Sequence, residues 1–322
     1  MKKEIIAIVG LGYWGTIVTN TIVKLNIFKK IYIHDSDIEK KNIIKKKFRR
    51  KVTPTTIKEI ISNNNIKNVF LATPPKKNFE LLKKLIKAKK NILIEKPGLI
   101  NKSHYKIIKK MLRINKNKLS FGYIYIYNNY IRYIKKIIDS KRLGEIKYIN
   151  FQRLNFGPIR NKVSAAFDLA THDISILYYL LKKKIKLNKA VNHDILNKKN
   201  YDISFLNLSA GKIKIDINVS WLNPEKIRKI IIIGSKKMLL YDEMNEKKPI
   251  QIYNNYVTFP KIDKFTKNYF NHSRYIFKGS SIGIKLSNKR PLSEEIKEFI
   301  KKNKIITDID FSHNVIQTFS KK

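Results

Sequence analysis

The sequence contains no cysteine, which excludes disulfide bonds, thiolate nucleophiles and cysteine metal sites. This absence fits a reducing compartment, and we expect the protein to be cytoplasmic. Runs of about 18 uncharged apolar residues are also missing, so we expect no membrane-spanning helix. Acidic residues are scarce, because 24 Asp and Glu stand against 69 Lys and Arg, and the formal net charge is +45.

This excess of basic residues has two explanations. A polyanionic partner such as nucleic acid would favour it, and so would a coding bias that enriches Lys, Ile and Asn throughout the chain. The basic residues are spread along the sequence rather than gathered in one tail. No RNP, helix-turn-helix or zinc pattern accompanies them. We therefore favour coding bias and predict no specific nucleic-acid partner.

The first 120 residues alternate short apolar runs with amphipathic stretches. Runs of strand length occupy 4–9, 31–35, 68–73 and 91–95, and a helical pattern follows each of them. This alternation is typical of βαβ units that build a parallel sheet. Beyond residue 140 most runs are strand-like and are separated by short turns, which indicates a mostly antiparallel sheet.

A glycine-rich turn, GLGYWG, follows the first predicted strand and opens the first predicted helix. Gly10 permits a tight turn, Gly12 lets the backbone approach a pyrophosphate, and Gly15 lets helix and strand pack closely. The N–H groups at the helix N-terminus favour phosphate charge. Tyr13 and Trp14 lie between the last two glycines and are predicted to contact the same cofactor.

Asp35 ends the next predicted strand, twenty residues beyond Gly15. A carboxylate at this place can accept hydrogen bonds from both ribose hydroxyls of NAD and would repel the 2′-phosphate of NADP. A helix cap or a turn residue is the alternative role for Asp35. Because Lys40 and Lys41 could accommodate a phosphate, NADP remains an alternative to NAD.

These features predict an α/β protein of two domains. Residues 1–120 would form a dinucleotide-binding Rossmann domain with a doubly wound parallel sheet. Residues 121–322 would form an α+β domain for substrate binding and oligomerisation, with a large, mostly antiparallel, open-faced sheet.

Several segments resemble the glucose-fructose oxidoreductase and inositol dehydrogenase family (Gfo/Idh/MocA). They are FLATPPKKNFELLKKLIKAKKNILIEKPG, FDLATHDISIL, NVSWLNPEKIRKIIIIGSKKMLLYDEM and PLSEEIKEFI. The resemblance implies that Thr73, Pro74 and Glu95 contact the cofactor. The sequence departs from the family at Asn78, where His is frequent, and at Lys89, where Gly is frequent. The stretch after Gly122 also lacks an arginine that many members carry.

Lys96 belongs to the E-K-P tripeptide of this resemblance. Proline restricts the residue before it to extended geometry, so Lys96 is held in place. In the predicted sheet it stands at the carboxyl end of a strand, where ligands of open α/β sheets bind. The resemblance implies that Lys96 touches the nicotinamide ribose and the reacting substrate oxygen.

The stretch AFDLATHDISILYYLL is apolar enough for a buried helix and yet carries three charged or titratable residues. Asp168 and His172 are four residues apart and share a helix face. A carboxylate at this spacing can orient the imidazole, and we predict that His172 is the base that accepts the hydroxyl proton. Asp168 would orient His172 or bind a sugar hydroxyl. Asp173 points elsewhere and either binds substrate or holds a neighbouring loop.

The segment RLNFGPIRNKVSAAFDLATHDISIL most resembles the UDP-N-acetylglucosamine and UDP-N-acetylglucosaminuronate 3-dehydrogenases of the family. This likeness implies that Arg153 and Arg160 face a diphosphate or carboxylate, for which arginine is suited, although ordinary surface charge explains them equally well. Tyr123 and Asn155 would line the same pocket.

The sequence thus predicts an NAD-dependent dehydrogenase acting on a sugar or nucleotide sugar, with a UDP-amino sugar of cell-surface polysaccharide synthesis as the first candidate. Reduction of an imine, another sugar or a polyol is the alternative, followed by nucleic-acid binding. The residues in FDLATHD complete no metal-ligand set, so no metal is predicted. By resemblance to the family, we expect a homodimer or homotetramer.

Overall fold

The computed structural model describes residues 4–161, 163–196, 200–257, 276–277, 279–287, 289–301 and 305–319. The chain forms two compact units. Unit 1 comprises Met1–Asn128 and Lys289–Gln317, and unit 2 comprises Asn129–Asn288 and Thr318–Lys322.

Unit 1 is built on a parallel sheet of six strands in the order β3-β2-β1-β4-β5-β6. The strands are β1 (Glu4–Val9), β2 (Phe28–His34), β3 (Thr53–Pro54), β4 (Asn68–Leu71), β5 (Asn91–Glu95) and β6 (Leu119–Gly122). The order reverses beside β1, which makes this a doubly wound Rossmann sheet. The predicted Rossmann domain is therefore confirmed, and two of the predicted strands, 4–9 and 91–95, have the observed bounds.

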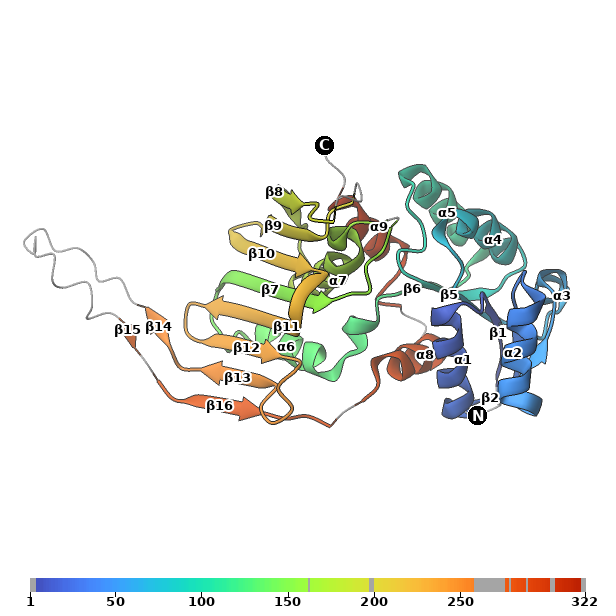
Figure 1. Ribbon diagram of the computed structural model, residues 1–322, viewed down its shortest axis with the longest axis horizontal. Helices are drawn as coiled ribbons and strands as arrows, with labels where there is room; N and C mark the ends of the chain where they lie inside the picture. The colour runs from blue at the N-terminus through green and yellow to red at the C-terminus, as the bar shows by residue number, and fades with distance from the viewer. Residues whose placement is uncertain are drawn as a thin grey trace, which may run out of the picture. The chain divides into compact units, whose positions relative to one another are not determined.

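Helices connect these strands and surround the sheet (Figure 1). They are α1 (Tyr13–Leu25), α2 (Ile38–Phe48), α3 (Ile57–Ser62), α4 (Pro75–Lys87) and α5 (Lys102–Asn115), with 3-10 turns at Arg49–Lys51 and Ile124–Tyr127. Helix α3 begins at a capping box in which Thr56 and Glu59 satisfy each other's backbone N–H groups. Helix α4 begins with Pro75, whose fixed φ suits the first turn.

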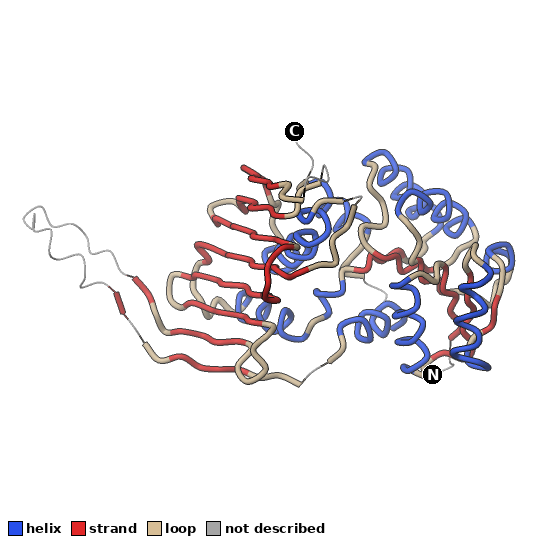
Figure 2. Tube along the Cα trace, viewed as in Figure 1, coloured by secondary structure: helices blue, strands red, loops and turns tan. Residues whose placement is uncertain are grey.

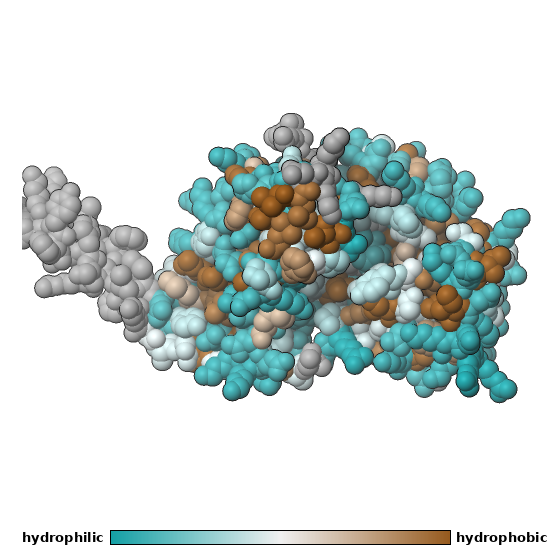
Figure 3. Space-filling view, viewed as in Figure 1, coloured by the Kyte–Doolittle hydropathy of each residue, from teal (hydrophilic) through white to brown (hydrophobic). Residues whose placement is uncertain are grey.

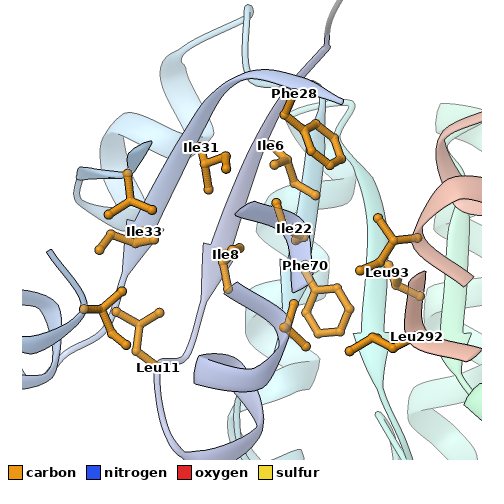
Figure 4. Close-up of a cluster of buried hydrophobic side chains, with 14 of the residues drawn as sticks. Ile6, Ile8, Leu11, Ile22, Phe28, Ile31, Ile33, Phe70, Leu93 and Leu292 are labelled. Atoms are coloured by element: carbon orange, nitrogen blue, oxygen red, sulfur yellow. The ribbon is translucent and has the colours of Figure 1, made fainter. Parts of the chain in front are cut away.

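The core of unit 1 recruits residues from the far end of the chain. Figure 4 shows Leu292 of α8 (Pro291–Lys301) beside Leu93 of β5 and Phe70 of β4. Ile296 and Phe299 of α8 are buried in the same cluster. Helix α9 (Ile309–Gln317) also belongs to unit 1. The structure thus differs from the predicted division at residue 120, because the apolar face of α8 is buried against the parallel-sheet core.

Unit 2 contains an eight-stranded sheet in the order β16-β13-β12-β11-β7-β10-β9-β8. The strands are β7 (Ile146–Phe156), β8 (Lys186–His193), β9 (Ile203–Ala210), β10 (Ile213–Ser220), β11 (Leu222–Gly234), β12 (Met238–Asp242), β13 (Ile250–Tyr253) and β16 (Ser281–Ile284). A separate pair joins β14 (Tyr256–Val257) and β15 (Ile276–Phe277). Strands β7 and β10 are parallel and the other neighbours are antiparallel, which confirms the mostly antiparallel sheet.

The two faces of this sheet differ because side chains alternate along each strand. In β9 and β10, residues such as Leu206, Leu208 and Ile215 are buried, whereas Phe205 is 45% exposed. Figure 2 shows the strands side by side with the helical segments of unit 2 against them. These segments are α6 (Asn129–Asp139), a π-helical turn η3 (Ala166–Ala170) and α7 (Thr171–Leu181). Apolar side chains are visible among polar ones over the sheet in Figure 3.

Candidate functional site

The glycine turn lies between β1 and α1, where the sequence places it. Gly10 has φ +92°, and a Cβ there would lie 2.7 Å from the carbonyl oxygen of Ala72. A Cβ on Gly15 would lie 1.9 Å from the carbonyl oxygen of Gly10, so this position requires glycine for close packing. At Gly12, by contrast, a Cβ would meet no atom within 4 Å. Gly12 is also the N-cap of α1.

The open space at Gly12 and the N-terminus of α1 together suit a dinucleotide phosphate, because exposed helix N–H groups attract anions. Tyr13 is 86% exposed at this place. Trp14 instead packs against the hydrophobic core, and its indole N–H meets no acceptor among the described residues. The structure therefore leaves Tyr13 at the surface of the turn and turns Trp14 inward.

Asp35 is fixed at the end of β2 by two backbone donors. The N–H of Leu11 donates to its Oδ2 at 2.7 Å, and the N–H of Asp37 donates to its Oδ1 at 2.9 Å. Burial opposes ionisation of Asp35, but the two N–H groups together with the charge of Lys40 hold its pKa below the ordinary value. The carboxylate thus ties the glycine turn to β2. Asp37, which donates the second of these hydrogen bonds, is the N-cap residue of α2.

The lysines considered as phosphate ligands lie on α2. Lys40 forms an ion pair with Asp37 at 3.2 Å, and Lys41 is half-buried on the same helix. The two side chains of this pair are 49% and 41% exposed, so solvent reaches both charges and the pair is a weak surface contact.

A second turn follows β4 and carries Thr73 and Pro74. Strand β4 pairs with β1 on one side and with β5 on the other. The hydroxyl of Thr73 donates to Oδ1 of Asn78 at 2.5 Å, and Pro74 is the exposed N-cap of α4. The turn therefore stands at the carboxyl edge of the parallel sheet, beside the glycine turn.

A third turn follows β5 and carries Lys96. The Lys96–Pro97 peptide is cis, and the N–H of Leu99 donates to the carbonyl of Pro97 at 2.8 Å. Gly98 has φ +67°, and a Cβ there would lie 2.6 Å from the ring of Phe121. The hydroxyl of Tyr105 donates to the carbonyl of Leu99 at 2.9 Å. The turn that presents half-buried Lys96 is consequently held at several points.

Glu95 and Tyr123 lie near this turn. A Cβ on Gly122 would lie 2.9 Å from Oε2 of Glu95, so the glutamate lies over the end of β6. Tyr123 is 0% exposed, and its hydroxyl shares a hydrogen bond of 3.2 Å with Ser312. Tyr123, which is predicted to line a substrate pocket, has its ring packed inside unit 1, and burial raises its pKa well above the ordinary value.

In unit 2, Asp168 and His172 are both half-buried, one in the π-helical turn and the other in the first turn of α7. The prediction of one continuous α-helix is corrected here, because a π-helical turn contains more residues per turn than an α-helix. Such turns are frequent at functional sites. Asp168 accepts a hydrogen bond from Nε of Arg160 at 2.8 Å, with Arg160 54% exposed.

Arg153 and Asp173 form a buried ion pair. Nη2 and Nε of Arg153 lie 2.6 and 2.9 Å from Oδ1 of Asp173, and the side chains are 6% and 2% exposed. Burial raises the pKa of Asp173, and the guanidinium opposes that shift. Arg153 and Asp173, both predicted to bind substrate, are thus engaged with each other inside unit 2, and the pair joins α7 to β7.

Asn155 is likewise engaged within unit 2. Its amide donates to the carbonyl of Gly157, and its Oδ1 accepts from Arg228. Arg228 also donates to the carbonyl of Leu154 at 2.7 Å. Asn155, which is predicted to line the substrate pocket, is 9% exposed and joins β7 to β11. Of the predicted substrate residues, Arg160 alone is exposed.

Two fully buried polar residues, Asn78 of α4 and Glu295 of α8, are not among the predicted site residues. Asn78 was noted only as a departure from the family pattern, yet it is 0% exposed and bonded to two turns. Glu295 was not singled out, although it is a fully buried carboxyl group on α8. The signal for Glu295 was available, since PLSEEIKEFI places one acid on the apolar face of the helix.

Among the residues that the structure describes, no group of three or more His, Asp or Glu side chains is arranged to hold a metal ion. None of the helices in that part of the chain combines the length and hydropathy needed to span a bilayer.

Comparison with known families matches both units of the chain. Residues 5–123 match the oxidoreductase family with an NAD-binding Rossmann fold, GFO/IDH/MocA. Residues 131–240 match the C-terminal domain of the same family. No curated protein matches the chain in sequence.

Solved structures share the fold at low sequence identity. UDP-N-acetylglucosamine 3-dehydrogenase GnnA from Acidithiobacillus ferrooxidans has a TM-score of 0.77 at 16% identity, covering 98% of this chain and 95% of that chain. A scyllo-inositol dehydrogenase from Lactobacillus casei, solved with NAD(H) and scyllo-inositol, has a TM-score of 0.78 at 16% identity, with coverage of 98% and 94%. A putative NADPH-dependent oxidoreductase from Desulfitobacterium hafniense has a TM-score of 0.81 at 15% identity, with coverage of 99% and 94%.

Proposed function

Because the chain belongs to the GFO/IDH/MocA family of NAD-binding oxidoreductases, we propose that it is a dehydrogenase of sugar or nucleotide-sugar hydroxyl groups. The first candidate substrate is a UDP-amino sugar oxidised at C3, which would serve cell-surface polysaccharide synthesis. The likeness of residues 153–177 to such enzymes supports this choice, and one of the structural neighbours bears the name of such an enzyme.

The observation that carries the proposal is the arrangement of three turns at one edge of the parallel sheet. Gly10–Gly12, Thr73 and Lys96 follow β1, β4 and β5, which are neighbours in the sheet. Ligands of doubly wound sheets bind at this edge, near the point where strand order reverses. A phosphate-binding turn and a fixed lysine at the same edge suit a dinucleotide whose reactive end points toward the lysine.

Bound NAD supplies the acceptor for a hydride from the alcohol carbon. Lys96 would donate a hydrogen bond to the reacting oxygen, and His172 would accept the hydroxyl proton as the C–H bond breaks and the carbonyl forms. Asp168, which is paired with Arg160, would orient His172 or bind a sugar hydroxyl. Arg160 is the exposed cation that we assign to a diphosphate or carboxylate of the substrate.

A panel of substrates tests this proposal. The wild-type protein with NAD is expected to form NADH with UDP-N-acetylglucosamine or its uronate, detected by absorbance, and Lys96→Met to lose the activity. Lys110→Met, an exposed lysine of α5, is the matched control. Activity with inositol or reduction of an imine would establish the alternative substrates. Absence of turnover with every substrate in both directions would contradict the proposal.

We propose a homodimer or homotetramer, on the family resemblance. The exposed residues on the sheet of unit 2 support it, since Phe205 and Val191 are neighbours there and are 45% and 41% exposed. Sedimentation equilibrium of the wild type and Phe205→Lys tests it: the charge is expected to weaken association, and a wild-type monomer would contradict it.

A further inference from the structure

Asn78 lies in the first turns of α4, between the Thr73 turn and the Lys96 turn. Its side chain is 0% exposed. Oδ1 accepts the hydrogen of the Thr73 hydroxyl at 2.5 Å, and Nδ2 donates to the carbonyl of Gly98 at 2.8 Å. One amide group therefore connects two turns that follow the neighbouring strands β4 and β5, and its bond to Gly98 spans 20 residues of the chain.

The bond to Thr73 fixes the direction of a hydroxyl group. A threonine hydroxyl has one hydrogen and two acceptor lone pairs. Because the hydrogen points to Asn78, the lone pairs point elsewhere, so Thr73 is prepared to accept a hydrogen bond rather than to donate one. A ribose hydroxyl is a donor that suits such an acceptor.

The hydrogen bond from Asn78 to Gly98 and the packing of Phe121 on Gly98 both hold the other turn. Gly98 is packed against Phe121, and its carbonyl is held by Asn78. Lys96 precedes it by two residues, so displacement of Gly98 moves the segment that carries the ammonium. A misplacement of about 1 Å at a reacting group can cost about 100-fold in rate.

We propose that Asn78 is a positioning residue that sets the Thr73 hydroxyl and the Lys96 turn in register with the same bound cofactor and substrate. The part of the inference that concerns Lys96 rests on the proposed function. The part that concerns Thr73 depends on cofactor affinity alone. Asn78 itself touches neither ligand and acts through the two turns.

Three substitutions separate the two hydrogen bonds from simple packing. Asn78→Leu removes both hydrogen bonds and keeps a side chain of similar volume. Thr73→Val removes only the hydrogen bond between Thr73 and Asn78. Asn117→Leu is the matched control, because the Asn117 amide also bridges two backbone carbonyls, of Ile86 and Lys90, at 3.2 and 2.8 Å. It precedes β6 and lies away from the three turns. Thermal unfolding of each variant reports any loss of folded structure.

The expected result is a split between kinetic constants. Asn78→Leu should lower kcat about 100-fold and raise the Kd of NADH, measured by fluorescence. Thr73→Val should raise the Kd of NADH with a smaller change in kcat. Asn117→Leu should lower the Tm. At a temperature where this variant is fully folded, its kcat and its Kd for NADH should stay within about twofold of the wild type. Equal kinetics for Asn78→Leu and the wild type would overturn the proposal.

Two titratable replacements give a sharper test. A neutral imidazole has one acceptor and one donor, as the bridge requires, whereas a protonated imidazole only donates. A protonated carboxyl also has both, whereas a carboxylate only accepts. Relative to wild type, Asn78→His should therefore lose activity as the pH falls, and Asn78→Asp as the pH rises. Parallel profiles for the two variants would contradict the bridge.

The outcomes distinguish this inference from the proposed function. If no substrate is turned over by the wild type, the proposed function fails. The Kd of NADH for Asn78→Leu and Thr73→Val still decides the cofactor half. Unchanged affinity in both variants would then reject the positioning role.

Discussion

The two units hold their buried charged groups in different ways. In unit 2 the guanidinium of Arg153 is bonded to both carboxylate oxygens of Asp173. In unit 1 neither oxygen of Glu295 has a hydrogen-bond partner among the described residues. A buried charge is tolerated when it is paired, and an unpaired acid tends to take up a proton instead.

The comparison teaches how each unit fixes its own candidate residues. In unit 2, Asp173 follows His172 directly on α7, and its pairing with Arg153 of β7 fixes the first turn of that helix on the sheet. In unit 1, glycine and proline permit the turns that follow β1, β4 and β5. The Asp35 carboxylate holds the first turn, and the Asn78 amide holds the other two. Unit 2 thus fixes the first turn of a helix with a buried ion pair, and unit 1 fixes its turns mainly through backbone conformation.

The largest expected effect separates chemistry from cofactor binding. His172→Asn should lower kcat about 10²–10⁴-fold, as expected for loss of a general base, and leave the Kd of NADH unchanged.

Gly10→Ala should abolish NADH binding, because its φ of +92° and the nearby carbonyl of Ala72 leave no room for a methyl group. Stopped-flow turnover and NADH fluorescence measure the two effects. A His172→Asn variant that loses cofactor binding would break the division between units.

The next effect concerns the buried pair. Arg153→Met leaves Asp173 without its cation and should lower the free energy of unfolding by about 3–5 kcal/mol. Adding Asp173→Leu should recover a large part of that loss, since no unpaired charge remains. Urea unfolding of the single and double variants forms a double-mutant cycle. Additive losses would show that the two residues do not stabilise unit 2 as a pair.

A smaller effect tests the cofactor turn. Asp35→Asn keeps the size of the side chain and removes its negative charge, so the preference for NADH over NADPH should fall about tenfold, in line with hydrogen bonds to charged groups. The ratio of the two dissociation constants measures it. Asp37→Asn, which changes the helix cap two residues away, is the control. An unchanged ratio would leave Asp35 with the structural role of holding Leu11.

The smallest effect is expected at Glu295. Burial, followed by repulsion from Glu95, raises its pKa well above 4.5. Because the folded pKa exceeds the unfolded value, the folded state is fully favoured below pH 4.5, and stability is lost as the pH rises through the folded pKa. The Tm of Glu295→Gln should therefore equal that of the wild type in acid. As the pH rises, it should increasingly exceed the Tm of the wild type at the same pH.

The control for this titration is Glu294→Gln on the same helix, where the wild-type glutamate pairs with Lys297 at 2.9 Å. Its Tm should differ little from wild type, because such surface pairs contribute at most about 1 kcal/mol. If Glu295→Gln and the wild type keep the same Tm across the pH range, Glu295 is ionised or hydrated in solution.

The sequence carried the local features of this fold well. The runs EIIAIV and NILIE are continuous and apolar because their strands are buried on both faces, and their bounds could be read directly. The glycine turn was also readable, since its glycines have separate steric reasons. By contrast, the sequence pattern of α8 shows that the helix has an apolar face but not which unit buries it. The packing of α8 on the core of unit 1 could therefore not be read from a local pattern.

The candidate site was predictable where backbone geometry defines it and less so where partners do. Asp35 and Lys96 follow strands, and parallel strands bring their ends together. Arg153 and Tyr123 resembled ligand-binding residues in sequence, but their partners, Asp173 and Ser312, lie 20 and 189 residues away. Pairing over such separations is decided by tertiary packing.

The most direct test of the central claim follows the hydride itself. The protein is incubated with NAD and UDP-N-acetylglucosamine that carries deuterium at C3, and the NADH formed is analysed by mass spectrometry. The account predicts deuterium in the NADH from the C3-labelled sugar and none from a C4-labelled one. Unlabelled NADH from the C3-labelled sugar, or deuterium from the C4-labelled one, would contradict oxidation at C3.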